Sequence, residues 1–367
     1  MKIIYSWGAS IHVKPFVEAD IRAWRNAGYD ITSIDHREEL GIERAWEFPK
    51  LNELYVNKDD RLYRFYDKIR ALAKTHDVFI VNYENVYHPE FIKSLTDIYT
   101  VAVSGDDPEG SDRCSKPYVH AFDHSFAWGV QFDKDTKITE RFLQWGAKRA
   151  DRWDHGVTPE RYSTSLKVED IYSRERDVDL VYVGTSGIKV ACISKLKRAF
   201  PQMQIYGRGW RGLDIIAGIV RSKKVSALWD SWAGGLWHTA ELPIEKLVPL
   251  YQRSKIGINV HLSYSLANER LYQLPANGVM QLSDCPDELN EVFDLGKEVV
   301  GYHSIKEAIN LARYYLAHDN ERKDIAAAGF LRVMKDYQRV HTFTQTIDII
   351  KRGMLEDGKM LDPTTGL

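Results

Sequence analysis

Short apolar runs alternate with longer segments whose apolar residues recur at helical spacing, and the alternation continues through both halves of the chain. In the first half, the runs at 2–5, 30–34, 78–81 and 99–103 predict strands, and a helix that ends before Gly28 separates the first two. Strands that alternate with helices are typical of a parallel, doubly wound sheet. The loop at the carboxyl end of each strand is then a candidate ligand contact.

A polar and charged stretch from Val157 to Asp177 contains Pro159 and shows no clear period, so it predicts a linker. A second alternating series follows it. Its expected strands lie at 178–183, 203–206, 256–260, 279–282 and 298–300, and its last helices at about 304–336 and 342–354.

These patterns predict an α/β protein with two Rossmann-like domains that face each other across a cleft. We expect residues 1–165 to form the first domain and residues 178–345 the second. Residues 346–367 are expected to form a C-terminal helix and tail, with the helix packing back on the first domain.

Composition narrows the class of protein. The 367 residues suit two domains, and the net charge of −2 gives no general attraction to nucleic acid or to an anionic membrane. Three cysteines stand far apart without a CxxC pattern, which predicts a reduced, cytoplasmic setting. We expect neither a signal peptide nor a membrane span, because no apolar run is long enough for either.

The stretch from Asn268 to Gly278 carries the strongest functional signal, because it lies between two runs that predict strands. It predicts a short helix closed by glycine, with Asn268 and Glu269 at its start. Such a strand–loop–helix unit holds phosphorylated ligands with free N–H groups and a partial positive charge. Arg270 adds a planar, charged fork, and Gln273 can point toward the same end of the ligand.

Two further turns of the second half are candidate ligand loops. Gly184, Thr185 and Lys189 follow the predicted strand at 178–183, where small residues allow close backbone approach and the lysine can meet a phosphate. Tyr206 and Gly207 follow the next predicted strand. A plain turn explains either sequence equally well, and neither contains the GxGxxG fingerprint of dinucleotide-binding proteins.

In the first half, Asp106 and Asp107 directly follow a predicted strand, so they are candidates for a general base or for orienting an acceptor hydroxyl. Carboxylates also bind hard cations, and a simple capped turn is the structural alternative. Asp123 and His124 are candidates for holding an acceptor, although a histidine at such a position is often structural. Gly8 lies in a tight loop after the first strand.

The second half resembles the CgeB-like glycosyltransferases, which are similar to the broad family 1/4 glycosyltransferases. The first half resembles them more loosely, at Gly105–Pro108 and Phe122–His124. The resemblance rests on an ordered series of motifs at Gly184–Thr185, Ile205–Trp210, Tyr251–His261, Asn268–Arg270, Ala276–Gly278, Leu282–Asp284, Phe293–Val300, Ile325–Gly329 and His341–Phe343.

The resemblance implies a glycosyltransferase B (GT-B) fold and a nucleotide-diphosphate sugar as co-substrate, most readily a UDP-sugar, bound without a metal ion or other cofactor. It also favours retention of anomeric configuration. The acceptor would bind to the first domain, where Gly8, Asp123 and His124 are the predicted contacts. The predicted donor contacts are Gly184, Thr185, Lys189, Tyr206, Gly207, Asn268, Glu269, Arg270 and Gln273.

The chain departs from the family pattern at two positions. Gln273 stands where such families carry a glutamate that contacts the donor ribose, and Ser265 stands where they carry a second glutamate. An amide can bind a diol but lacks the charge that strengthens such bonds. A non-catalytic nucleotide- or sugar-binding module is therefore one alternative, and a dehydrogenase is a weaker one.

The acceptor is not identified by the sequence. It can be a glycan, a protein, a small molecule or a hydroxymethylated base of viral DNA. In an inverting enzyme Asp106 or Asp107 would deprotonate the acceptor, whereas in a retaining enzyme the leaving phosphate can take that proton. The DNA alternative draws on a possible basic edge formed by Arg208, Arg211, Arg221, Lys223 and Lys224.

Overall fold

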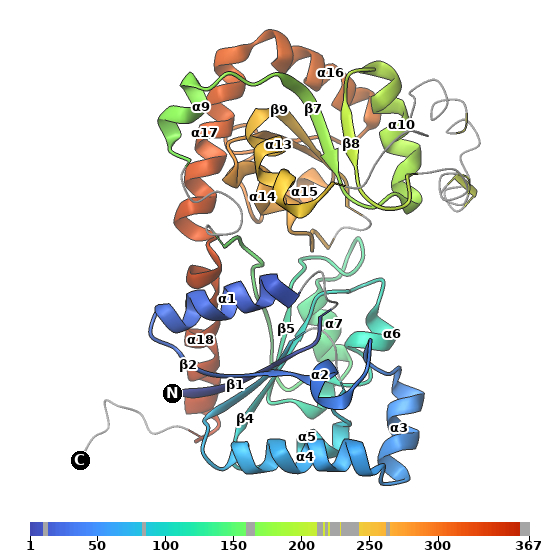
Figure 1. Cartoon of the computed structure of the whole chain (residues 1–367), viewed down its shortest axis with the longest axis vertical. Coiled ribbons are helices and arrows are strands. Elements are labelled where there is room, and N and C mark those ends of the chain that lie inside the picture. The colour runs from blue at the N-terminus through green and yellow to red at the C-terminus, as the bar shows by residue number, and fades with distance from the viewer. Residues whose placement is uncertain are drawn as a thin grey trace. The chain divides into compact units, whose positions relative to one another are not determined.

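The computed structural model describes residues 1–9, 14–82, 86–158, 166–210, 242–261 and 265–359, together with the isolated positions 216, 219, 220 and 228 (Figure 1). The chain divides into two compact units. Unit 1 comprises Met1–Arg161 and Gln338–Leu367, and unit 2 comprises Tyr162–Tyr337. Each unit is built around one parallel β-sheet.

Unit 1 contains a six-stranded sheet in the order β2-β1-β3-β4-β5-β6, and every neighbouring pair is parallel. β2 lies on one side of β1, and β3 and the later strands lie on the other, so the strand order switches between β1 and β3. Open α/β sheets bind ligands at the carboxyl ends of the strands that flank such a switch. The strands are β1 (Lys2–Trp7), β2 (Asp30–Asp35), β3 (Val78–Asn82), β4 (Tyr99–Ser104), β5 (His124–Ala127) and β6 (Ala150–Arg152).

Apolar residues on both faces explain why these strands are buried. All five residues of β3 are buried, as expected for a strand covered by helices on each side. The helical elements before the C-terminal helix are α1 (Lys14–Asn26), α2 (His36–Leu40), α3 (Phe48–Val56), α4 (Asp60–Ala73), α5 (Pro89–Lys93), α6 (Ser111–Cys114), η1 (Val119–Ala121) and α7 (Ile138–Gln144).

The C-terminal helix α18 (Arg339–Glu356) packs on unit 1, as predicted (Figure 1). The rings of Trp24 and Phe343 stack with their centroids 4.1 Å apart. Trp24 Nε1 also donates a hydrogen bond of 3.1 Å to the carbonyl of Arg339. Ile347 and Ile350 join the same core, so the last helix completes the face of the sheet that α1 covers.

Unit 2 contains a five-stranded parallel sheet in the order β11-β10-β9-β7-β8. The order switches between β7 and β9, which places the expected ligand edge at the carboxyl ends of these two strands. The strands are β7 (Val178–Val183), β8 (Gln204–Tyr206), β9 (Ser254–Asn259), β10 (Met280–Ser283) and β11 (Val300–Gly301).

Two groups of helices cover this sheet. Helices α10 and α16 contact each other, and α17 contacts α9, α14 and β10 (Figure 1). None of the helices within the described ranges combines the length and apolar character that a membrane crossing requires. The helical elements are α9 (Val168–Ser173), η2 (Gly187–Lys189), α10 (Val190–Ala199), η4 (Ile244–Lys246), α13 (Leu247–Arg253), α14 (Arg270–Ala276), α15 (Pro286–Leu289), α16 (Ile305–Ala317) and α17 (Asp319–Asp336).

Two expected elements differ from the structure. The helix expected over about 304–336 is two helices, because His318 has the non-helical backbone angles φ −114 and ψ 72. The stretch expected to be a linker, 157–177, contains the short helix α9 in its described part.

Candidate functional site

Arg270 lies at the carboxyl ends of β7 and β9, where the strand order of unit 2 switches. Its Nε donates to the carbonyl of Val183 at 2.9 Å, and its Nη1 donates to Asn259 Oδ1 at 3.2 Å. The guanidinium lies over the ring of Tyr182, 4.7 Å from its centroid. Because three contacts hold this buried side chain, its orientation is fixed before any ligand arrives.

Two glycines keep the space next to Arg270 open. A Cβ at Gly184 would lie 2.7 Å from Arg270 Nη2, so any larger residue would press on the guanidinium. Gly207 has φ +134, and a Cβ there would lie 2.2 Å from the carbonyl oxygen of Gly184. The amide of Gly184 donates to the carbonyl of Tyr206 at 2.9 Å, which joins the two loops. The predicted loop after β7 therefore lies against Arg270, and the loop after β8 lies against the loop after β7.

The other predicted donor contacts have different positions. Asn268 is linked to this site, since its Nδ2 donates to Asn259 Oδ1 at 3.2 Å. Thr185 is exposed, and Lys189 is buried at the end of η2. The hydroxyl of Tyr206 donates to Gln204 Oε1 at 3.3 Å, so Tyr206 takes part in the site through its backbone.

Helix α14 is shorter than predicted, and the amides that follow Arg270 already donate within the chain. It has 7 residues and begins at Arg270. The amide of Leu271 donates to Asn268 Oδ1 at 3.0 Å, and the amide of Gln273 donates to the carbonyl of Glu269 at 3.0 Å. These amides are thus occupied within the chain, and the expectation that the helix N-terminus supplies an N–H donor for a phosphate stays a prediction for the amide of Arg270. The positive charge at this edge comes from side chains.

Gln273, the atypical residue of the sequence, is paired with a carboxylate. Its Nε2 donates to Glu269 Oε2 at 2.8 Å, from one turn further along α14. The chain therefore places a carboxylate within hydrogen-bond distance of the side chain that replaces the family glutamate. Ser265 is buried and accepts a long bond of 3.5 Å from the amide of Ala267.

A histidine–aspartate pair at the ends of β9 and β10 was not singled out from the sequence. His261 Nδ1 lies 2.6 Å from Asp284 Oδ1, and the backbone amide of His261 donates to the same carboxylate. Both are polar residues close behind predicted strands, which is the signal that could have found them.

With Cys285, these two residues form the one group within the described residues whose ligand atoms, all within 4.8 Å of one another, could hold a metal ion. Burial and the nearby Asp284 carboxylate raise the pKa of the Cys285 thiol well above its ordinary value. Because His261 and Asp284 already satisfy each other at 2.6 Å, we describe the group as a hydrogen-bonded His–Asp pair.

The corresponding edge of unit 1 places His36 and Asn82 at Gly8, together with the side chain of Arg37. A Cβ at Gly8 would lie 2.3 Å from His36 Nε2, so only glycine fits beside this ring. His36 directly follows β2, and Asn82 ends β3. Trp7, which precedes Gly8, pairs with Asp35 on one side and with Asn82 on the other. His36 and Asn82 therefore flank Gly8 at the switch between β1 and β3.

Two atoms of this group are buried without a hydrogen-bond partner in the described structure, namely His36 Nε2 and Asn82 Oδ1. The other ring nitrogen, His36 Nδ1, lies 3.1 Å from Ser6 Oγ. Burial lowers the pKa of His36 to about 3, so the ring is neutral at physiological pH. A ligand hydroxyl can both donate and accept, which would satisfy both atoms.

The two adjacent aspartates after β4 have different environments. The buried carboxylate of Asp107 accepts hydrogen bonds from three hydroxyls, at 2.5 Å from Ser104, 2.6 Å from Ser111 and 2.5 Å from Ser115. Asp106 is partly exposed, at 32%, and its Oδ2 accepts from Arg113 at 2.8 Å. The geometry therefore favours a structural role for Asp107 and leaves Asp106 as the accessible carboxylate.

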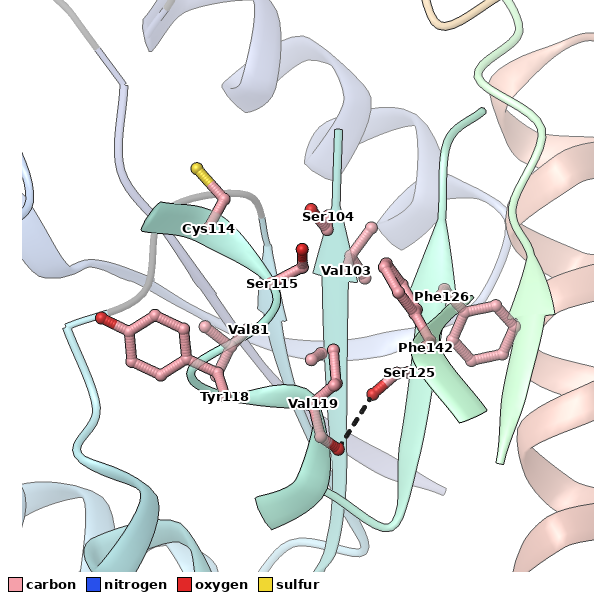
Figure 2. A pocket seen from close by; sticks show the side chains of 11 residues that line it. Val81, Val103, Ser104, Cys114, Ser115, Tyr118, Val119, Ser125, Phe126 and Phe142 are labelled. Atoms are coloured by element: carbon pink, nitrogen blue, oxygen red, sulfur yellow. Dashed lines mark hydrogen bonds between the residues drawn. The ribbon is translucent and has the colours of Figure 1, made fainter. Parts of the chain in front are cut away.

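Figure 2 shows the cavity next to this group, which Ser104, Ser115, Tyr118 and Ser125 line together with apolar side chains. Its volume is about 10 Å³. That is the space of roughly one water molecule, so the cavity cannot take a sugar.

Asp123 and His124 lie at the wrong end of the sheet for the role predicted for them. β5 begins at His124, so both residues stand at its amino end, whereas Gly8 follows the carboxyl end of β1. Asp123 Oδ2 accepts from the amide of Thr100 at 2.9 Å and from Lys359 Nζ at 2.9 Å. This corrects the prediction that the two residues share an acceptor site with Gly8. Asp123 instead binds Lys359, which follows the C-terminal helix α18.

Comparisons with known proteins bear on the fold of the chain. Residues 189–348 match the model of the glycosyl transferase-like family, and no curated protein sequence matches the chain. Sucrose-phosphate synthase from Thermosynechococcus elongatus superposes with a TM-score of 0.60 at 12% identity, over 97% of this chain and 100% of that one. The chain has the GT-B fold.

Two other GT-B structures show the same similarity. A glycosyltransferase from Rickettsia africae has a TM-score of 0.60 at 11% identity, with 96% of this chain and 99% of that one covered. HepE from Anabaena, in complex with UDP and glucose, has a TM-score of 0.63 at 12% identity, with 96% and 100% covered. At such low identity the similarity shows the GT-B fold and leaves the substrates of this chain to be argued from its own residues.

Proposed function

We propose that the protein transfers a sugar from a nucleotide-diphosphate sugar, with UDP as the nucleotide, to an acceptor hydroxyl. The observation that supports this most is Arg270, which is fixed at the β7/β9 switch next to Gly184 and Gly207. A permanently charged fork beside bare backbone suits a diphosphate. HepE, which has the same fold, has been crystallised with UDP and with UDP-glucose.

In this proposal the side chains of unit 2 hold the donor without a metal ion. Arg270 and Lys189 would neutralise the leaving diphosphate, and the Glu269–Gln273 pair would bind the ribose hydroxyls. Unit 1 would supply the acceptor side through Gly8, and the unpartnered atoms His36 Nε2 and Asn82 Oδ1 beside it would bind a hydroxyl. We favour retention, in which the leaving phosphate takes the acceptor proton, and we place the enzyme in the cytoplasm, which suits three cysteines without a disulfide.

Thermal unfolding with a panel of nucleotides tests the donor half of the proposal. UDP is expected to raise the unfolding temperature of the chain more than UMP or uridine does, because the diphosphate contacts Arg270. A ligand at 100 times its Kd stabilises a protein by about 2.7 kcal/mol. Absence of any shift with UDP, GDP and ADP would remove the proposal.

A non-catalytic binding module is the second candidate, and it rests on Gln273 and Ser265. The two candidates differ in chemistry, so hydrolysis or transfer of a UDP-sugar distinguishes them. We expect slow release of free sugar even without an acceptor. Binding of UDP with no release and no transfer to any glycan or small-molecule acceptor would favour the module.

The Glu269–Gln273 pair leads to a specific prediction. Glu269→Gln is expected to weaken UDP binding about tenfold, since hydrogen bonds to charged groups are worth roughly 1.5–3 kcal/mol. The same change should leave binding of inorganic pyrophosphate unaltered, because the ribose is the group that loses its partner. Glu175→Gln is the matched control, because Glu175 is an exposed glutamate of unit 2. Equal UDP affinity in wild type and Glu269→Gln would contradict the assignment.

The basic edge on which the DNA alternative depends lies mostly outside the described residues. Of the basic residues assigned to that edge, Arg208 is exposed after β8, and the others, Arg211, Arg221, Lys223 and Lys224, lie outside the described residues. We retain modified DNA only as one acceptor class beside glycans, proteins and small molecules.

A further inference from the structure

Helices α10 and α16 border a groove of about 1260 Å³ on unit 2. Each helix contributes basic residues to it at helical spacing. Lys195 and Arg198 are three positions apart on α10, and Lys306 and Arg313 are seven positions apart on α16. Residues at these spacings lie on one face of a helix, so each wall of the groove carries a basic stripe.

The positive charge of the groove is largely uncompensated. Asp284 is the single acidic residue among its described lining residues, and it is already paired with His261. Lys195, Lys306 and Arg313 form no ion pair within the described part of the chain. Because the whole chain has a net charge of −2, this concentration of cations is a local feature that attracts an anionic ligand.

The size and lining of the groove favour one class of anion. Ordinary small-molecule pockets measure roughly 300–1,000 Å³, so this groove suits an extended chain. Single-stranded nucleic acids need a series of exposed aromatic faces for their bases. Of the two rings in the described lining, Tyr302 is buried with its hydroxyl donating to the carbonyl of Asn259, which leaves the single exposed imidazole of His303. Ser304 and Asn310 offer polar groups that suit sugar hydroxyls.

We infer that this groove binds an acidic polysaccharide, and that Lys195, Lys306 and Arg313 form ion pairs with its carboxylates. The inference rests on the proposed function, since a transferase that builds an acidic glycan gains from holding the chain near its donor site. The structure connects the two regions. The hydroxyl of Tyr302, in the groove, donates a hydrogen bond to the backbone carbonyl of Asn259. The side-chain oxygen of the same asparagine accepts a hydrogen bond from Arg270.

Fluorescence anisotropy with a labelled polygalacturonate oligosaccharide tests the inference. We expect binding that weakens as salt rises, no binding of a neutral dextran oligosaccharide, and weaker binding of a dT oligonucleotide with the same number of charges. Lys306→Glu and Arg313→Glu should each lower the affinity for polygalacturonate roughly three- to tenfold. Lys335→Glu, an exposed change on α17, is the matched control and should have no effect.

Four results would overturn the inference, and the first three concern binding of the labelled ligands. These are the absence of polygalacturonate binding, binding of dT as tight as or tighter than that of polygalacturonate, and a loss of affinity in the Lys335→Glu control as large as in Lys306→Glu and Arg313→Glu. Displacement of polygalacturonate by UDP would also overturn it, because the groove would then be part of the donor pocket. The proposed function is judged separately by the UDP-dependent thermal shift of the wild-type chain, which does not involve the groove.

Discussion

Replacing Arg270 with alanine is expected to lower kcat/KM for transfer from a UDP-sugar about a hundredfold or more. The guanidinium is buried and held by Val183 and Asn259, so it needs no reorganisation when charge develops on the leaving diphosphate. Removing one such preorganised donor costs roughly 2.7–4 kcal/mol in transition-state stabilisation. Initial rates at saturating acceptor and thermal shifts with UDP measure the effect.

Arg270→Lys separates charge from geometry. A lysine keeps the positive charge but cannot bond to Val183 and Asn259 while also facing the ligand, so we expect most of the loss to remain. Arg253→Ala is the matched control, because Arg253 is an exposed arginine of unit 2 that pairs with Asp177. Wild-type turnover in Arg270→Ala, with unchanged thermal stability, would remove the donor assignment.

The parts of the fold that follow from the sequence are those with a strong local signal. Apolar runs predicted β1, β3, β7 and β9, because a strand covered on both faces is mostly apolar along its length. The four-residue strand β5 has the sequence HSFA, with two polar residues in four, and it was not predicted. The break at His318 contains neither glycine nor proline, and its one signal is the pair Asp319 and Asn320, residue types that are common at helix starts.

The strength of the local signal also explains which residues of the candidate site were predicted correctly. Gly184, Gly207 and Arg270 follow strands that were predicted, and parallel strands bring such positions to one edge. Asp123 and His124 were assigned to the wrong edge because the start of β5 was not recognised. His36 and Asn82 are single polar residues at strand ends, and their importance comes from burial and register, which pairing across the sheet determines.

The adjacent residues Asp106 and Asp107 are indistinguishable in the sequence, yet substitution of Asp107 should lower stability, whereas substitution of Asp106 should affect turnover alone. Asp107→Ala is expected to lower the free energy of unfolding of unit 1 by about 3 kcal/mol. It removes a buried carboxylate and leaves three serine hydroxyls to find new partners, and hydrogen bonds to charged groups are worth roughly 1.5–3 kcal/mol each. Chemical denaturation followed by circular dichroism measures the change.

Asp106→Asn should leave stability within about 0.5 kcal/mol of wild type, since an exposed ion pair such as that with Arg113 contributes little. The turnover of Asp106→Asn then distinguishes whether the acceptor proton goes to the leaving phosphate or to Asp106. If the leaving phosphate takes the acceptor proton, as we propose, the rate should fall by about tenfold or less. A general base contributes roughly 10²–10⁴-fold, so a loss of that size with intact folding would make Asp106 the base and the enzyme inverting. A stable, fully active Asp107→Ala protein would contradict the structural role of that carboxylate.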